Sequence, residues 1–143
     1  MPHLIIEFSA NACTSTGGSV DVDGLVDALH DAALATGVAS LDALRTRAVG
    51  RNHFAIADRH PDNAFIAVTA RLGAGRSDGD RRRFIESLME ALEVFLGDAR
   101  QTMMLSVEYQ EIDPDMRINH NHLRALVAER IDLADGTEQG DLR

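Results

Sequence analysis

The stretch AFIAVTARLGAGRS, residues 64–77, decides the fold. Its first nine residues are rich in β-branched side chains and favour a strand. A glycine-rich turn follows, and Ser77 then has the position of a helix N-cap, with Asp80 three residues further on. Beyond Ser77, apolar residues recur at helical spacing, at Phe84, Ile85, Leu88, Met89, Leu92, Phe95 and Leu96. Together with MMLSVEY at 103–109, the pattern predicts a strand, a helix and a second strand.

The first half of the chain repeats this order. LIIEF at 4–8 predicts a strand, and ALRTRAV at 43–49 alternates as a strand does. Asp21 or Asp23 can cap a helix between them, and Gly37 can end it; its apolar residues are Val22, Leu25, Val26, Leu29 and Ala33. Because a right-handed crossover joins parallel strands, we expect an α/β (α+β) fold of tandem β-α-β units. Two such units, at about 2–50 and 63–112, give a four-stranded sheet with two helices on one face.

The remaining segments complete a single expected domain at 2–131. Residues 50–62 join the two units, and a weaker helical pattern near 119–131 predicts a C-terminal helix. Residues 132–143 are polar, so we expect a flexible tail. Both long strands carry apolar residues at successive positions, which predicts that a second copy of the chain covers the open face of the sheet.

Composition excludes several functional classes. The 143 residues are 45% hydrophobic, enough for a core, and their formal net charge is -9, which argues against a nucleic-acid partner. No apolar run approaches membrane-spanning length, so no membrane partner is expected. One cysteine, Cys13, cannot form an intrachain disulfide. A cytoplasmic protein is therefore expected.

Pro2 allows two interpretations. Proline lacks an amide hydrogen and often occupies the first position of a strand, and position alone favours this structural role. If Met1 is removed, however, the nitrogen of Pro2 becomes a secondary amine. Apolar surroundings and nearby cations lower the pKa of such an amine, and a base that titrates near neutral pH is suited to proton transfer.

Three arginines are candidates for binding an anion. Arg45 and Arg47 lie two residues apart in a predicted strand, so they share a face where a guanidinium can hold a carboxylate through two parallel hydrogen bonds. Arg76 lies in the turn before a capped helix, where free amide groups and the helix dipole favour an anion. Simple solvent exposure remains the alternative for each. The spacing of His120 and His122 does not predict a metal site, and nothing marks Cys13 as a nucleophile.

Four motifs follow one another in this chain: PHLIIEFS at 2–9, ATG at 35–37, LRTR at 44–47 and FIAVTARLGAGRS at 65–77. Together they resemble the 5-carboxymethyl-2-hydroxymuconate delta-isomerase family of the tautomerase superfamily, and the resemblance extends from Pro2 to about Val127. It implies a tandem β-α-β fold assembled as a homotrimer. It further implies that Pro2, freed from its methionine, is the base, and that Arg45 and Arg76 bind or polarise a dicarboxylate substrate. Arg47 is a lesser candidate.

The reaction that the resemblance implies moves a double bond in a 2-hydroxymuconate-type dicarboxylate, during the breakdown of the aromatic compound homoprotocatechuate. No metal or organic cofactor is expected, because the carbonyl of the substrate itself accepts the electrons. Two alternatives stay open. Residues 48–62, which we expect to line the pocket, lack the aromatic-rich sequence of the family, so the chain could be a ketone–enol tautomerase of another 2-oxo acid. It could also be a non-catalytic trimeric binding protein in which Pro2 is structural.

Overall fold

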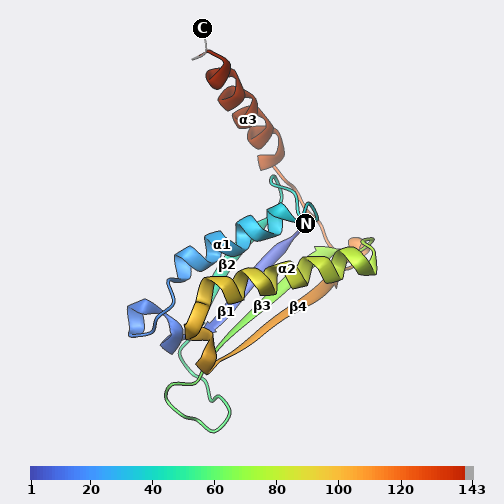
Figure 1. Ribbon diagram of the computed structural model, residues 1–143. Coiled ribbons are helices and arrows are strands. Elements are labelled where there is room, and N and C mark those ends of the chain that lie inside the picture. The colour runs from blue at the N-terminus through green and yellow to red at the C-terminus, as the bar shows by residue number, and fades with distance from the viewer. Residues whose placement is uncertain (141–143) are drawn as a thin grey trace.

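The computed structural model describes residues 1–140, with side chains described as far as Thr137. One sheet forms its centre, in the strand order β2-β1-β3-β4 (Figure 1). The strands are β1 (His3–Ser9), β2 (Arg45–Arg51), β3 (Ala64–Gly73) and β4 (Met103–Ile112). β1 is parallel to β2, β3 is parallel to β4, and β1 is antiparallel to β3. The predicted pair of β-α-β units in one four-stranded sheet is confirmed.

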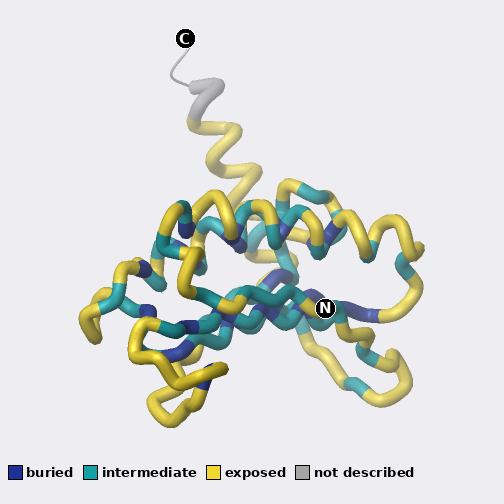
Figure 2. Tube along the Cα trace, turned by 60° about the horizontal axis from the view of Figure 1, so that its bottom comes forward, coloured by how far each residue is buried: buried dark blue, intermediate teal, exposed yellow. Residues whose placement is uncertain are grey.

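Helices α1 (Val22–Ala35) and α2 (Asp78–Leu96) cover the same face of the sheet (Figure 2). α1 begins at Val22 because the carboxylate of Asp21, rather than that of Asp23, accepts a hydrogen bond from the amide of Gly24 at 3.2 Å. α2 begins where the Ser77 hydroxyl accepts a hydrogen bond from the Asp80 amide at 3.1 Å. Both helices therefore start at caps that the sequence indicates.

The core lies between the two helices and the sheet. Apolar side chains that are at most 1% exposed come from β1, β3, α1 and α2: Leu4, Ile6, Leu25, Leu29, Ala33, Ile66, Val68, Ala70, Leu72, Phe84, Leu88 and Leu92. Alternate residues of β3 are fully buried and half-buried, so only one face of the strand is sealed by helices. On the opposite face, Met104 of β4 is 61% exposed. This face remains available to a partner.

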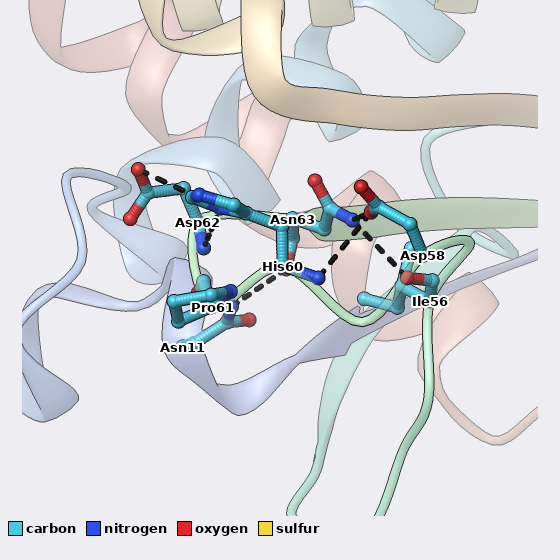
Figure 3. A network of polar contacts seen from close by, with 7 residues as sticks. All are labelled: Asn11, Ile56, Asp58, His60, Pro61, Asp62 and Asn63. Atoms are coloured by element: carbon cyan, nitrogen blue, oxygen red, sulfur yellow. Dashed lines mark hydrogen bonds and ion pairs between the residues drawn. The ribbon is translucent and has the colours of Figure 1, made fainter.

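The connection between β2 and β3 is tied to the far end of β1 (Figure 3). The side-chain amide of Asn63 donates hydrogen bonds to the Ile56 carbonyl and the Asp58 carboxylate, at 3.1 and 2.7 Å. The side-chain amide of Asn11 donates to the carbonyl of Asn63 at 2.7 Å. Since the seven residues of β1 span roughly 23 Å, these contacts are far from Pro2. Within one subunit, β2 therefore carries residues 52–62 away from Pro2. The expected contribution of residues 48–62 to the pocket stays a prediction.

A third helix, α3 (Leu123–Gly140), projects from the body beside the N-terminal end of β1 (Figure 1). Its base is attached to Asp42, whose carbonyl accepts a hydrogen bond from Asn121 at 2.8 Å and whose carboxylate pairs with Arg124 at 2.7 Å. The helix continues beyond the predicted end at Ile131. Residues 132–139 lack proline, and they include several good helix formers. Residues 141–143 of the predicted flexible tail lie outside the described residues. Within those that are described, no helix is both long and apolar enough to cross a membrane.

Candidate active site

Pro2 lies at the entrance to the central strand β1, where the chain is already buried. Its carbonyl accepts a hydrogen bond from the Arg45 amide at 3.3 Å, which fixes the start of β1 against β2. Burial and four arginines, Arg117, Arg76, Arg45 and Arg124, lower the pKa of the amine at Met1. An amine at this end of the chain is therefore held in its neutral, basic form more readily than an ordinary terminus.

Arg45 and Arg47 point to the same side of the sheet, as their spacing predicts. In the register of the sheet, His3 lies opposite Arg45 and Ile5 lies opposite Arg47. The Nη1 atom of Arg45 is 2.9 Å from Nε2 of His3, and Nη1 of Arg47 is 3.1 Å from Nδ1. A neutral imidazole has one acceptor nitrogen, so only one of these guanidiniums can donate to His3 at a time.

His3 is held neutral by its surroundings. Burial lowers its pKa from 6.5 to about 4, with the charges of Arg45, Arg47 and Arg71 acting in the same direction. A neutral ring tolerates two guanidiniums beside it, whereas an imidazolium would repel both. His3 therefore positions Arg45 beside the start of β1.

Arg76 is anchored to the main chain, so it is neither simply solvated nor free. Its Nη1 donates to the Gly73 carbonyl at 2.9 Å, and its Nη2 donates to the Val38 carbonyl at 3.2 Å. These bonds join the glycine-rich turn to the loop after α1 and leave the guanidinium near the N-terminus. The turn requires Gly75, whose φ of 110° is rarely open to residues with a side chain.

The structure adds a residue that no sequence signal indicates. Arg117 follows the short helix Pro114–Met116 after β4, in a segment that returns over the start of β1. Its guanidinium lies against Gly73, where an added Cβ would be 3.3 Å from Nη2. In the same segment, Oδ1 of Asn119 accepts a weak hydrogen bond of 3.5 Å from Arg45. A lone arginine in an irregular connection could be recognised only once the path of that connection was known.

Three of the four arginines beside the N-terminus, Arg45, Arg76 and Arg117, form no ion pair with a described carboxylate. The ion pairs of the described residues join Glu7 to Arg51, Arg81 to Asp78 and Glu111, Arg83 to Asp80, Arg124 to Asp42, and His60 to Asp62. Arg45, Arg76 and Arg117 belong to none of these pairs. A chain with a net charge of -9 thus keeps a local cluster of uncompensated positive charge at one end of its sheet. Such a cluster favours an anionic ligand.

The other candidate side chains do not join this cluster. The rings of His120 and His122 are exposed, with centroids 6.5 Å apart. Among the described residues, no group of three histidine, cysteine, aspartate or glutamate side chains is arranged to hold a metal ion. Cys13 lies near the other end of β1, with its sulfur 3.2 Å from the Ser15 hydroxyl. A depression of about 550 Å³ at that end is lined by Asn11, Gly17, Pro61 and Asp98, among others, and it is separate from Pro2.

Comparison with known sequences decides the family. The sequence profile of 5-carboxymethyl-2-hydroxymuconate isomerase matches residues 2–127, which include Pro2, Arg45, Arg76 and Arg117. The chain belongs to this family. It is also 30% identical to a 5-carboxymethyl-2-hydroxymuconate Delta-isomerase of Escherichia coli over 128 residues, or 88% of this chain and 98% of that relative. The prediction of an isomerase of this family is confirmed.

Solved structures agree with the 5-carboxymethyl-2-hydroxymuconate isomerase fold. A 5-carboxymethyl-2-hydroxymuconate isomerase from Deinococcus radiodurans R1 superimposes with a TM-score of 0.78 at 25% identity, over 88% of this chain and 93% of that one. A fused 4-OT, described as an asymmetric trimer, matches with a TM-score of 0.63 at 19% identity, over 87% and 98%. The second match concerns the fold alone, and it confirms the predicted tautomerase architecture.

Proposed function

We propose that this chain is a cofactor-independent isomerase that moves a double bond in a 2-hydroxymuconate-type substrate, with the amino group of Pro2 as the base. A muconate has a carboxylate at each end, and the carboxymethyl group in the family name adds a third. The observation that carries the proposal is the buried start of β1 beside Arg45, Arg76 and Arg117, which have no carboxylate partners among the described side chains. That site suits a multiply charged anion.

In the proposed reaction, removal of Met1 converts the nitrogen of Pro2 into a secondary amine. This amine accepts the proton of the 2-hydroxyl group, and the electron pair left on oxygen forms the carbonyl. The conjugated double bonds shift, and a carbon of the system takes the proton back from the ammonium. The substrate and the product have the same atoms and electrons, so the reaction needs no oxidant or reductant.

Each arginine acts on negative charge. Arg45 and Arg76 bind a substrate carboxylate and stabilise the charge that develops on the 2-oxo oxygen. Burial and the same positive charges lower the pKa of the amine at Met1, and we expect them to act likewise on the amine of Pro2 once Met1 is removed, which keeps the base neutral before the proton transfer. Arg47 contacts His3 and lies further along β2 from Pro2 than Arg45 does. Arg47 therefore has the lesser role.

We further propose that the enzyme works as a homotrimer. The side of the sheet that α1 and α2 leave uncovered carries exposed Met104 and half-buried Ile5 and Phe65. Burial of such a surface by a second copy is favourable, and a trimer is the state named for the fused 4-OT of the same fold. A role in the breakdown of homoprotocatechuate remains a prediction.

The test combines intact mass with kinetics. Purified native protein should lack Met1 and should isomerise 5-carboxymethyl-2-hydroxymuconate. Pro2→Ala should lower kcat by about 10-fold or more, since a general base contributes roughly 10²–10⁴-fold, while the oligomer stays intact in size-exclusion chromatography. An active protein that retains Met1, or unchanged kinetics in Pro2→Ala, would contradict the proposed base. Efficient turnover of simple enol acids at the expense of the muconate would favour the ketone–enol tautomerase instead.

A further inference from the structure

In each of the two arginines expected to bind substrate, both terminal nitrogens, Nη1 and Nη2, already contact a protein group. Arg76 uses Nη1 for the carbonyl of Gly73 and Nη2 for the carbonyl of Val38. Arg45 has Nη1 at His3 and Nη2 at Asn119. A substrate with several carboxylates therefore calls for a further donor group close to the N-terminus.

Arg117 has the geometry of that group. Its Nη1 is buried and finds no hydrogen-bond acceptor among the residues that the structure describes. A buried donor on a charged group is costly when it is left unpaired. No ion pair of the described chain includes Arg117, so no described carboxylate neutralises it. The protein thus buries a charged donor that a ligand could satisfy.

The surroundings of Arg117 place this donor within the cluster around Pro2. The guanidinium packs against Gly73, whose carbonyl receives the hydrogen bond from Arg76. An added Cβ on Gly73 would be 3.3 Å from Nη2 and 3.7 Å from Nη1 of Arg117. Gly73 thereby lets Arg117 lie next to the turn that holds Arg76. The guanidiniums of Arg76 and Arg117, which are about forty residues apart in the sequence, thus both contact Gly73.

We propose that Arg117 binds a substrate carboxylate other than the one held by Arg45 and Arg76, and so makes the site selective for polycarboxylates over monocarboxylates. This inference rests on the proposed function. A carboxylate on Nη1 satisfies the buried donor, and the planar guanidinium can offer two parallel N–H groups to one carboxylate. Arg117 is then a specificity-determining residue, because it acts on substrate charge and not on proton transfer.

The experiment measures binding and turnover separately. Adipate, a saturated dicarboxylate with the six-carbon skeleton of muconate, and hexanoate, its monocarboxylate counterpart, are titrated into the processed protein by calorimetry. The variants are Arg117→Gln, Arg117→Lys and the matched control Arg130→Gln, which removes the same charge from an exposed position on α3. Kinetics on 5-carboxymethyl-2-hydroxymuconate are measured for the same four proteins.

The unsubstituted protein should bind adipate more tightly than hexanoate, and Arg117→Gln should abolish most of that preference. Adipate affinity should fall by roughly 10- to 100-fold, the usual size of a lost hydrogen bond to a charged group. With the muconate, KM should rise far more than kcat falls. Arg117→Lys should recover part of the preference, because it keeps the charge but not the two-pronged donor. Arg130→Gln should behave like the unsubstituted protein.

An unchanged preference for adipate in Arg117→Gln, an equal loss in Arg130→Gln, or no preference in the unsubstituted protein would each overturn the assignment of Arg117. These outcomes differ from failure of the proposed function. If the preference follows Arg117 but the muconate is not converted, the isomerase proposal fails and the carboxylate site stands. If the muconate is converted equally well by Arg117→Gln, the isomerase stands and the role of Arg117 fails.

Discussion

His3 should make the stability of this protein depend on pH in the mildly acidic range. The surroundings of this imidazole lower its pKa from 6.5 to about 4, while in the unfolded chain it titrates near its ordinary value of about 6.5. As the pH falls through this window, the unfolded state binds the proton first. The contribution of His3 is therefore present above about pH 6.5 and is lost progressively towards pH 4.

The magnitude follows from the two pKa values. A change from 6.5 to about 4 corresponds to at most about 3.4 kcal/mol of unfolding free energy. Because the ring is only half-buried, solvent screening reduces the expected effect to about 1–2 kcal/mol. His3→Gln removes the titration and keeps one oxygen that can accept a hydrogen bond from Arg45 or Arg47.

The assay is urea unfolding at one protein concentration, from about pH 4 to about pH 7.5. As the pH is lowered, the unsubstituted protein should lose about 1–2 kcal/mol of unfolding free energy relative to His3→Gln. His53→Gln, an exposed histidine of the β2–β3 connection, serves as the control. A difference that stays constant with pH, or one that His53→Gln reproduces, would refute the reasoning.

Three further predictions concern the site and the core. Arg45→Gln removes a charge that lowers the pKa of the N-terminal amine, so the pKa of this amine should rise. The acid limb of the pH–kcat/KM profile of the processed enzyme should therefore move to higher pH. An acid limb that stays in place or moves to lower pH contradicts this. Arg76→Gln removes two hydrogen bonds to main-chain carbonyls and should lower the unfolding free energy by about 2 kcal/mol in urea unfolding. Arg83→Gln loses an exposed hydrogen bond to Thr36 and an exposed ion pair with Asp80, and it should lower the unfolding free energy by less than about 1 kcal/mol. Equal losses would show that Arg76 is not an anchor. Leu88→Ala, in a fully buried position of α2, should lower the unfolding free energy by about 2–5 kcal/mol in the same measurement. A loss below about 1 kcal/mol would mean that the core around residue 88 collapses onto the smaller side chain.

Local patterns predicted the elements of the fold. The apolar period in 84–96, the Ser77 cap and the two β-type runs of each half are signals within a few residues of each other, and each became the expected strand or helix. The pair Arg45 and Arg47 shares a face for the same reason, because alternate residues of a strand always do. The end of α3 was misjudged, since polar composition does not prevent a helix from continuing.

The amino-acid sequence by itself determined the two β-α-β units, their caps and the family motifs, because periodicity and capping act over one or two turns of chain. Only the tertiary structure decided what surrounds Pro2. The path of the chain after β4 brought Arg117 onto Gly73, the packing of the turn against the α1 loop engaged Arg76 with two carbonyls, and β2 carried residues 52–63 to the far end of the sheet. Apart from the local bond between Arg76 and Gly73, these contacts join residues tens of positions apart. Their geometry depends on strand order and loop paths that no local pattern encodes.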